Sequence, residues 1–475
     1  MVLQLYLSIS VMKKIILFLP ILILGIAATT SDYLNTWLSD EMLQPATVSL
    51  AVYDLDSNEY VLQHNSQKVL PAASVQKLIT TTIALKTLGS DHQFETILAY
   101  TGDIKDGILR GDIYIFPNFN PTLANKRFGK NISEITGAIK SWLAKNNVKV
   151  IAGIKVVDPT MKSETLPRTW IWEDIGNYYG ANPCGTVLNE NILELYFESG
   201  AAGEPTKIVK TIPDLPLLRV TNRVLSSEKN RDLAYAFGGP YERGLVVEGT
   251  IPANRKNFKV KAALQNPQKA LAYLVYEELK KSPFLTIKGK YGTLEKNKRP
   301  YKQFGVVKSA SVNEIVKKTN HKSVNILAEN LLQNSHMHSG SQRSMGIWAK
   351  DYLANKLNIS VAGMQLKDGS GLSRFNAISS QQLVELLIVM KDNKAFQNSL
   401  PTARKSGTVK SFLKNSSLNV RCKSGSMQGV RSYAGYMSTN SGRKFAFSII
   451  INNAEVKGSN VKKKIEELLI HVGGL

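Results

Sequence analysis

A change in residue pattern near residues 95 and 290 constrains the fold more than any other feature of the chain. Between these positions, short β-rich runs such as 112–116 and 244–251 alternate with polar loops. A chain of 475 residues is also far longer than the size at which a single hydrophobic core stops growing. We therefore expect residues 95–290 to form an inserted module that is mostly β.

The segments on either side of this insert share a second pattern, in which strands alternate with amphipathic helices. Apolar residues recur at helical spacing in 75–88 and 324–334, and strand-like runs occur near both ends of the chain. Residues 30–94 and 291–475 are therefore expected to form one mixed α/β (α+β) unit, here called the main unit, which the insert interrupts.

Residues 1–29 have the composition of a secretory signal peptide. Lys13 and Lys14 precede an apolar run from Ile15 to Ile26, which is followed by small and polar residues. Because this run is short for a bilayer span, we expect an exported mature protein that begins near the end of the leader. An uncleaved membrane anchor is the alternative.

The formal net charge is +23, with 60 Lys and Arg residues against 37 Asp and Glu residues. The basic residues are dispersed and no nucleic-acid-binding motif accompanies them, which argues against a nucleic-acid partner. For an exported chain we expect peripheral contact with an anionic envelope surface. A generally lysine-rich surface without a specific partner is the alternative.

The chain contains only two cysteines, Cys184 and Cys422, and six histidines. Two cysteines rule out a disulfide framework and a multi-cysteine metal site, whereas one bridge between them and two free thiols both remain open. Because the histidines are scattered, we expect no metal ion.

The first motif that suggests chemistry is Ser74-Val75-Gln76-Lys77, at the start of the predicted helix 75–88. The spacing places the Ser74 hydroxyl and the Lys77 amine one turn apart on one helix face, where the amine can take the hydroxyl proton. Lys77 must be neutral for this, and burial, the helix N-terminus and a second cation, for which Lys423 is the candidate, all lower an ammonium pKa. Alone, such a tetrapeptide is usually solvated helix surface.

The second motif, Ser323-Val324-Asn325, precedes the predicted helix 324–334. In a functional interpretation, Ser323 relays a proton to a leaving amine and the Asn325 amide holds the substrate backbone. Taken alone, the tripeptide is typical of a helix N-cap.

The third motif, Lys423-Ser424-Gly425, lies on a strand predicted to begin near Leu418. Lys423 and the Ser424 hydroxyl are expected to bind a carboxylate, and Gly425 to leave room for a substrate strand alongside. Each motif is weak alone, but their order, their separations and the export signal together favour a catalytic site.

With these motifs, the chain resembles the penicillin-binding serine peptidases, and within them the low-molecular-mass class C (type-4) penicillin-binding proteins. These are D-alanyl-D-alanine carboxypeptidases and endopeptidases. The resemblance covers nearly the whole mature chain and includes several further stretches. They are Phe94-Glu95-Thr96, Gly111-Asp112-Ile113-Tyr114, Pro121-Thr122-Leu123, Trp172-Glu173-Asp174, Tyr178-Tyr179-Gly180-Ala181 and Asp368-Gly369-Ser370-Gly371-Leu372-Ser373-Arg374.

The resemblance implies a penicillin-recognising transpeptidase fold, related to β-lactamases, whose insert forms two mostly β subdomains. It implies a periplasmic enzyme in which Ser74 attacks the carbonyl between two D-alanines, or the crosslink from D-alanine to a diamino acid. Backbone N–H groups of Ser74 and Ser426 would form the oxyanion hole, and no cofactor is needed. Peptidoglycan peptides are the implied substrates, and β-lactam antibiotics the implied covalent inhibitors.

The resemblance also implies a site for a diamino-acid side chain. In family members that bind diaminopimelic acid, the matching positions are Asp174 and Tyr179 in the insert and Arg374 and Gln428 in the main unit. An acid and a base suit a side chain that ends in both an ammonium and a carboxylate. A turn or helix-cap role is the alternative for Asp174.

Three positions depart from the family pattern. Ser424 replaces the usual threonine and keeps the hydroxyl, Val324 replaces a polar residue, and 117–121 replaces a glycine-rich turn that ends in Gly-Asp-Pro.

Two other functions compete with the peptidase. A serine β-lactamase or esterase of the same fold is disfavoured by the large insert, and a non-catalytic wall scaffold is disfavoured by the intact motif residues.

Overall fold

The computed structural model describes residues 32–161, 165–216, 218–240, 244–297, 299–454 and 458–474. The predicted leader, 1–29, lies outside these residues. Within the described ranges, no helix has both the length and the apolar composition needed to cross a membrane.

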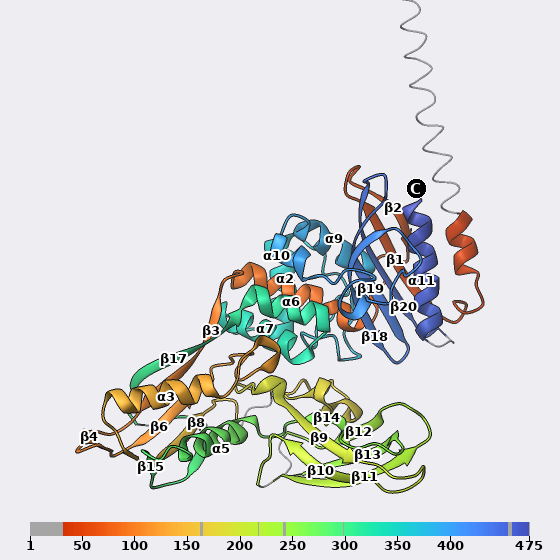
Figure 1. Ribbon diagram of the computed structural model, residues 1–475. Coiled ribbons are helices and arrows are strands. Elements are labelled where there is room, and N and C mark those ends of the chain that lie inside the picture. Colours follow the sequence, from red (N-terminus) through yellow and green to blue (C-terminus); the bar gives the residue numbers. More distant parts are fainter. Residues whose placement is uncertain are drawn as a thin grey trace, which may run out of the picture.

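The two ends of the chain meet in one antiparallel sheet. Its strands are β1 (Thr47–Asp54), β2 (Glu59–His64), β18 (Asn419–Met427), β19 (Val430–Ser438) and β20 (Lys444–Asn452). The order is β18-β19-β20-β1-β2, so β1 pairs with β20 along its whole length (Figure 1). This pairing joins the beginning and the end of the chain into one unit and confirms the mixed α/β (α+β) class.

Helices cover both faces of this sheet. They are α2 (Lys77–Thr87), α6 (Val312–Lys322), α7 (Asn325–His338), α8 (Met345–Leu357), α9 (Ser380–Met390), α10 (Lys394–Ser399) and α11 (Gly458–Gly473). Ala51 of β1 packs with α2 and α9 on one face, whereas its neighbours Leu50 and Val52 pack with α11 on the other. This alternation follows from the two-residue period of a strand.

Helix α2 is the central helix of the layer on one face. All of its residues from Lys77 to Leu85 are buried. A 3-10 helix, η1 (Ala73–Gln76), leads directly into it, so the predicted helix 75–88 is confirmed but begins with a tighter turn. Ser74 therefore lies where this buried helix emerges at the surface of the main unit.

The chain between α2 and α6 forms the insert, which is drawn below the main unit in Figure 1. Its first part contains β3 (Gln93–Tyr100), β4 (Ile104–Lys105), β5 (Ile108–Leu109), β6 (Asp112–Phe116), β7 (Val150–Ile151), β8 (Gly153–Val157), β15 (Thr286–Ile287), β16 (Tyr291–Leu294) and β17 (Lys302–Ser311). These strands form two sheets, ordered β16-β8-β6-β3-β17 and β15-β7-β5-β4. Helices α3 (Ser133–Lys145) and α5 (Pro267–Lys280) complete the core of this part.

The second part of the insert consists of two three-stranded sheets, ordered β10-β9-β14 and β11-β13-β12. The strands are β9 (Ile192–Glu198), β10 (Lys207–Ile212), β11 (Arg219–Ser227), β12 (Leu233–Phe237), β13 (Gly244–Pro252) and β14 (Phe258–Ala263). Strand pairing of the insert continues past residue 290, because β16 and β17 hydrogen-bond to β8 and β3. The domain boundaries at 95 and 290 stay predictions.

Candidate active site

Ser74 lines a cleft of about 440 Å³ between the main unit and the insert. The insert contributes α4 (Trp172–Ile175), the 3-10 helix η3 (Tyr178–Gly180) and β12. The full lining is Ala73, Ser74, Glu173, Asp174, Tyr178, Tyr179, Tyr235, Ser323, Asn325, Gly371, Leu372, Arg374, Ser426, Met427 and Gln428. Lys77 and Lys423 are fully buried rather than exposed in this lining.

The Lys77 amine contacts three oxygen atoms. Its Nζ lies 2.9 Å from Ser74 Oγ, 2.7 Å from Asn325 Oδ1 and 2.7 Å from the Ser370 carbonyl oxygen. The last two are pure acceptors, so they take the two N–H bonds of a neutral amine. The remaining lone pair then faces the Ser74 hydroxyl, which is the geometry that a general base for this serine requires.

Burial lowers the pKa of Lys77 from its ordinary value of 10.5 to about 7, while the carboxylates of Asp368 and Glu329 raise it. Burial, one of the three predicted causes, is thus the main cause of the lowered pKa of Lys77, whereas Lys423 and the helix N-terminus are not among its causes. The repulsion between the two lysines instead lowers the pKa of Lys423. Burial, and then the charge of Lys77, hold the pKa of Lys423 well below its ordinary value.

Ser323 and Lys423 are in direct contact. Ser323 ends α6 in a left-handed conformation with φ of 57°, and the N-cap position of α7 falls on Val324 without a side-chain cap. The N-cap interpretation of Ser323 is therefore wrong. Lys423 Nζ instead donates to Ser323 Oγ at 2.9 Å and to the Ser424 carbonyl at 2.6 Å. Because Ser323 Oγ accepts a hydrogen bond from Lys423, the hydroxyl proton of Ser323 is free to be donated to another acceptor.

Ser424 and Gly425 lie on β18 beside this pair. The Ser424 hydroxyl donates to Thr408 Oγ1 at 2.7 Å, which adds a hydroxyl that the sequence motifs did not indicate. A Cβ on Gly425 would lie 2.5 Å from the Ala72 carbonyl and 3.1 Å from the Ser74 nitrogen. Besides any room for substrate, glycine is thus needed here because η1 packs directly against β18.

The insert carries Asp174 and Tyr179 to the opposite wall of the cleft. Burial raises the pKa of Asp174, while the charge of Arg374 and a hydrogen bond with Tyr179 lower it. Asn325 Nδ2 donates to the Tyr179 carbonyl at 2.8 Å, so the Ser323-Val324-Asn325 motif and the insert are joined directly. Arg374 Nη1 donates to the Gln428 carbonyl at 3.4 Å, which places these two predicted residues side by side.

The sequence motifs did not indicate the groups that contact or face Lys77 on its buried side. The Ser370 carbonyl, the Glu329 carboxylate and the Asp368 carboxylate all lie in the buried layer behind the amine. A usable signal for Glu329 was its position four residues after Asn325, on the same face of the helix.

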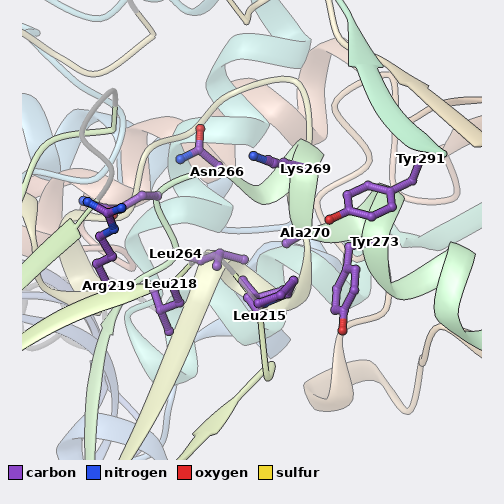
Figure 2. A pocket seen from close by; sticks show the side chains of 11 residues that line it. Leu215, Leu218, Arg219, Leu264, Asn266, Lys269, Ala270, Tyr273 and Tyr291 are labelled. Carbon is purple, nitrogen blue, oxygen red and sulfur yellow. The ribbon is translucent and has the colours of Figure 1, made fainter.

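Other candidate sites carry no comparable chemistry. Cys184 and Cys422 are both free and buried. In the part of the chain that the structure describes, no three His, Cys, Asp or Glu side chains are grouped to hold a metal ion. A second cavity, of about 320 Å³, lies in the insert and is lined mainly by apolar and tyrosine side chains, with Arg219 and Lys269 (Figure 2).

The chain is similar to proteins with known activity. It is 25% identical over 451 residues to the D-alanyl-D-alanine carboxypeptidase DacB of Haemophilus influenzae, covering 90% of this chain and 91% of the relative. The crystal structure of penicillin-binding protein 4 (dacB) from that organism matches with a TM-score of 0.77 at 22% identity, over 91% of this chain and 96% of that one. A second structure of it, complexed with a β-lactam, matches with a TM-score of 0.73 at 21% identity, over 94% of this chain and 98% of that one.

The D-Ala-D-Ala carboxypeptidase 3 (S13) family matches residues 30–472, which is nearly the whole described chain. This match and the relatives above confirm the resemblance to type-4 penicillin-binding proteins that the motifs predicted. The protein is therefore a member of the D-Ala-D-Ala carboxypeptidase 3 (S13) family of serine hydrolases.

Proposed function

We propose that the protein is an exported, periplasmic D-alanyl-D-alanine carboxypeptidase and endopeptidase. It acts on peptidoglycan stem peptides and crosslinks through an acyl-enzyme on Ser74. The observation that carries this proposal is the position of Lys77, a fully buried amine with two carbonyl acceptors and one hydroxyl neighbour. That arrangement supports activation of Ser74 by a neutral lysine.

In the first step, Ser74 Oγ attacks the carbonyl carbon of the D-alanyl bond and its proton passes to Lys77 Nζ. Backbone N–H groups of Ser74 and Ser426 stabilise the oxyanion. The Ser323 hydroxyl gives its proton to the leaving amine, and the C–N bond breaks. The proton on Lys77 then restores the Ser323 hydroxyl, and water hydrolyses the ester with the roles reversed.

Substrate position is assigned to the two walls of the cleft. Asn325 holds the substrate backbone, while Lys423, Ser424 and Gly425 bind its carboxylate side along β18. Asp174 and Arg374, from opposite walls, suit a side chain that ends in an ammonium and a carboxylate, such as diaminopimelic acid. Tyr179 and Gln428 complete this set. β-Lactams, one of which is bound in the structure of a relative, acylate the same serine.

One proposed contact lies outside the cleft. The net charge of +23 favours peripheral contact with an anionic envelope surface. No cofactor takes part in the proposed mechanism.

The proposal is tested with muropeptides that contain diaminopimelic acid. Purified protein that starts after the leader is incubated with pentapeptide monomers and with crosslinked dimers, and the products are identified by mass. Loss of terminal alanine from monomers, or splitting of dimers, is expected, and Ser74→Ala should abolish both. Unchanged muropeptides, with wild-type protein that still takes up fluorescent penicillin at Ser74, would overturn the substrate assignment while leaving the nucleophile intact.

A further inference from the structure

The Ser370 carbonyl is one of the two acceptors that orient the Lys77 amine. A backbone carbonyl cannot rotate by itself, so its direction depends on the loop that carries it. Here the loop is 368–374, which packs against η1 and ends at Arg374. The way in which this loop is fixed therefore decides where the lone pair of Lys77 points.

Both oxygen atoms of Glu329 hold this loop. Oε2 accepts the Gly369 N–H at 2.9 Å and Oε1 accepts the Ser370 N–H at 2.7 Å. The side chain is 2% exposed, so water does not compete for these bonds. Two charge-assisted bonds to adjacent amides fix the peptide units on both sides of Gly369.

Glu329 lies on α7, one turn after Asn325. Asn325 accepts from Lys77 directly, whereas Glu329 holds the peptide unit that precedes Ser370. The Ser370 carbonyl belongs to the next unit, whose Gly371 N–H donates to Asp368 Oδ1. One helix face thus supplies one acceptor of the amine and anchors the residue that carries the other. A purely structural glutamate would not need this alignment with the base.

The other end of the loop is fixed separately. Asp368 accepts the N–H groups of Gly371 at 2.8 Å and Ser373 at 2.6 Å, and the Trp170 indole N–H at 2.8 Å. Gly371 has φ of 78°, and a Cβ there would lie 2.1 Å from the Ala73 carbonyl. The loop is therefore pressed against η1. Glu329 accepts the N–H groups of its central peptide units, while the side chains of Gln76 and Thr80 donate to the Asp368 and Gly369 carbonyls of the same units.

We propose that Glu329 is a positioning residue of the peptidase. It fixes the peptide unit that precedes Ser370, Asp368 fixes the unit that follows, and together they hold the Ser370 carbonyl that orients the Lys77 amine toward Ser74. The inference rests on the proposed function of Ser74 and Lys77. Glu329 touches neither substrate nor the reacting atoms, and it acts through the loop.

Electrostatics adds a second consequence. The groups that face Lys77 with charge are Glu329 from α7, Asp368 from the loop and Lys423 from β18. Burial and the nearby Asp368 raise the pKa of Glu329, whereas the two backbone N–H groups, one on each carboxylate oxygen, favour the ionised form. The carboxylate of Glu329 raises the pKa of Lys77, so its removal moves the titration of Lys77 to lower pH.

The test compares Glu329→Gln with wild type in Ser74 acylation by a fluorescent penicillin, measured as a rate across pH. Glutamine keeps the shape of glutamate, but its NH₂ group would face one of the two backbone N–H donors, so that hydrogen bond cannot form. We expect the acylation rate to fall by about 100-fold, as for a misplaced catalytic group, and the acid limb of the profile to move to lower pH. A wild-type rate, or a slowed reaction with an unmoved limb, would overturn the proposal.

Glu385→Gln is the matched control, because Glu385 on α9 also accepts a loop amide, from Ser360 at 2.9 Å, away from the cleft. Its acylation profile should equal that of wild type. If Glu329→Gln does not fold, Glu329→Asp decides, since it keeps the charge and both acceptors. It should retain the wild-type limb and at least a tenth of the rate, and a folded but inactive Asp variant contradicts the inference. Wild-type protein that is not acylated at Ser74 would instead overturn the proposed function.

Discussion

The two walls of the cleft differ in how they treat charge. On the main-unit side, Lys77 and Lys423 are fully buried, and burial is the largest cause of the lowered pKa of each. On the insert side, Asp174 and Tyr179 are half-buried and line the open cleft. Under the proposed function, Lys77 transfers a proton from a desolvated position, whereas Asp174 recognises a charged side chain from an accessible one, with Arg374 of the main-unit wall as its partner.

Each arrangement has a physical reason. A lysine side chain in water is protonated at neutral pH and so has no lone pair to accept a proton. A lysine base must therefore be desolvated, which lowers its pKa and costs folding free energy. A carboxylate that must attract a charged substrate keeps its ionised form only if solvent or a partner cation reaches it. Arg374, which faces Asp174 across the cleft, supplies that partner in the free protein.

The largest expected effect comes from removing the base while keeping a cation. Lys77→Arg leaves a group that cannot lose its proton, so acylation by penicillin should slow by about 10²- to 10⁴-fold. Stopped-flow labelling measures the rate. Lys86→Arg, an exposed position on the same helix, is the control and should react as wild type. A fast Lys77→Arg variant would mean that the buried wall does not supply the base.

A smaller and more selective effect is expected on the insert wall. Asp174→Asn removes one charge-assisted contact, so kcat/KM for diaminopimelate muropeptides should fall by about 10- to 100-fold. Acylation by penicillin, which lacks this side chain, should stay within about twofold. Glu173→Gln removes the neighbouring cleft carboxylate and serves as the comparison. Equal losses in both variants would show a general charge effect in place of a specific contact.

The close packing of β18 against η1 predicts a combined effect on stability and rate. In Gly425→Ala the new Cβ would lie 2.3 Å from Ser432 Oγ and 2.5 Å from the Ala72 carbonyl. We expect the free energy of unfolding to fall by about 1–3 kcal/mol and acylation to slow, because Ser74 is displaced. Thermal unfolding and penicillin labelling check this. Unchanged values in both would contradict the packing described here.

The smallest effect is expected in the insert, away from the cleft. Gly137 lies within α3, and nothing lies within 4 Å of a Cβ placed there. Gly137→Ala should therefore raise the free energy of unfolding by about 0.5–1 kcal/mol without changing acylation. A changed acylation rate would show that this part of the insert is coupled to the serine.

The three sequence motifs predicted residues that lie in two contacting groups in the structure, one of Ser74, Lys77 and Asn325 and one of Ser323 and Lys423. Their catalytic roles stay predictions. Helical periodicity likewise predicted 324–334, which the structure extends to α7, Asn325–His338. These are local patterns with a fixed period or spacing.

The support behind Lys77 was not predictable in the same way. The Ser370 carbonyl is a backbone group, and no residue type marks it. Glu329 and Gly369 are 40 residues apart and meet only in the folded chain. The sheet pairing of β16 and β17 with earlier strands of the insert is non-local for the same reason.

The proposed function requires Lys77 to be a neutral base, and burial is what makes it neutral. The most direct test is the pH dependence of Ser74 acylation in the wild-type protein, followed with a fluorescent penicillin that does not itself titrate in the range. Since burial lowers the pKa of Lys77 to about 7, the rate should rise with pH and level off above that value as the amine loses its proton. A rate that keeps rising toward the ordinary lysine value of 10.5 would contradict the account.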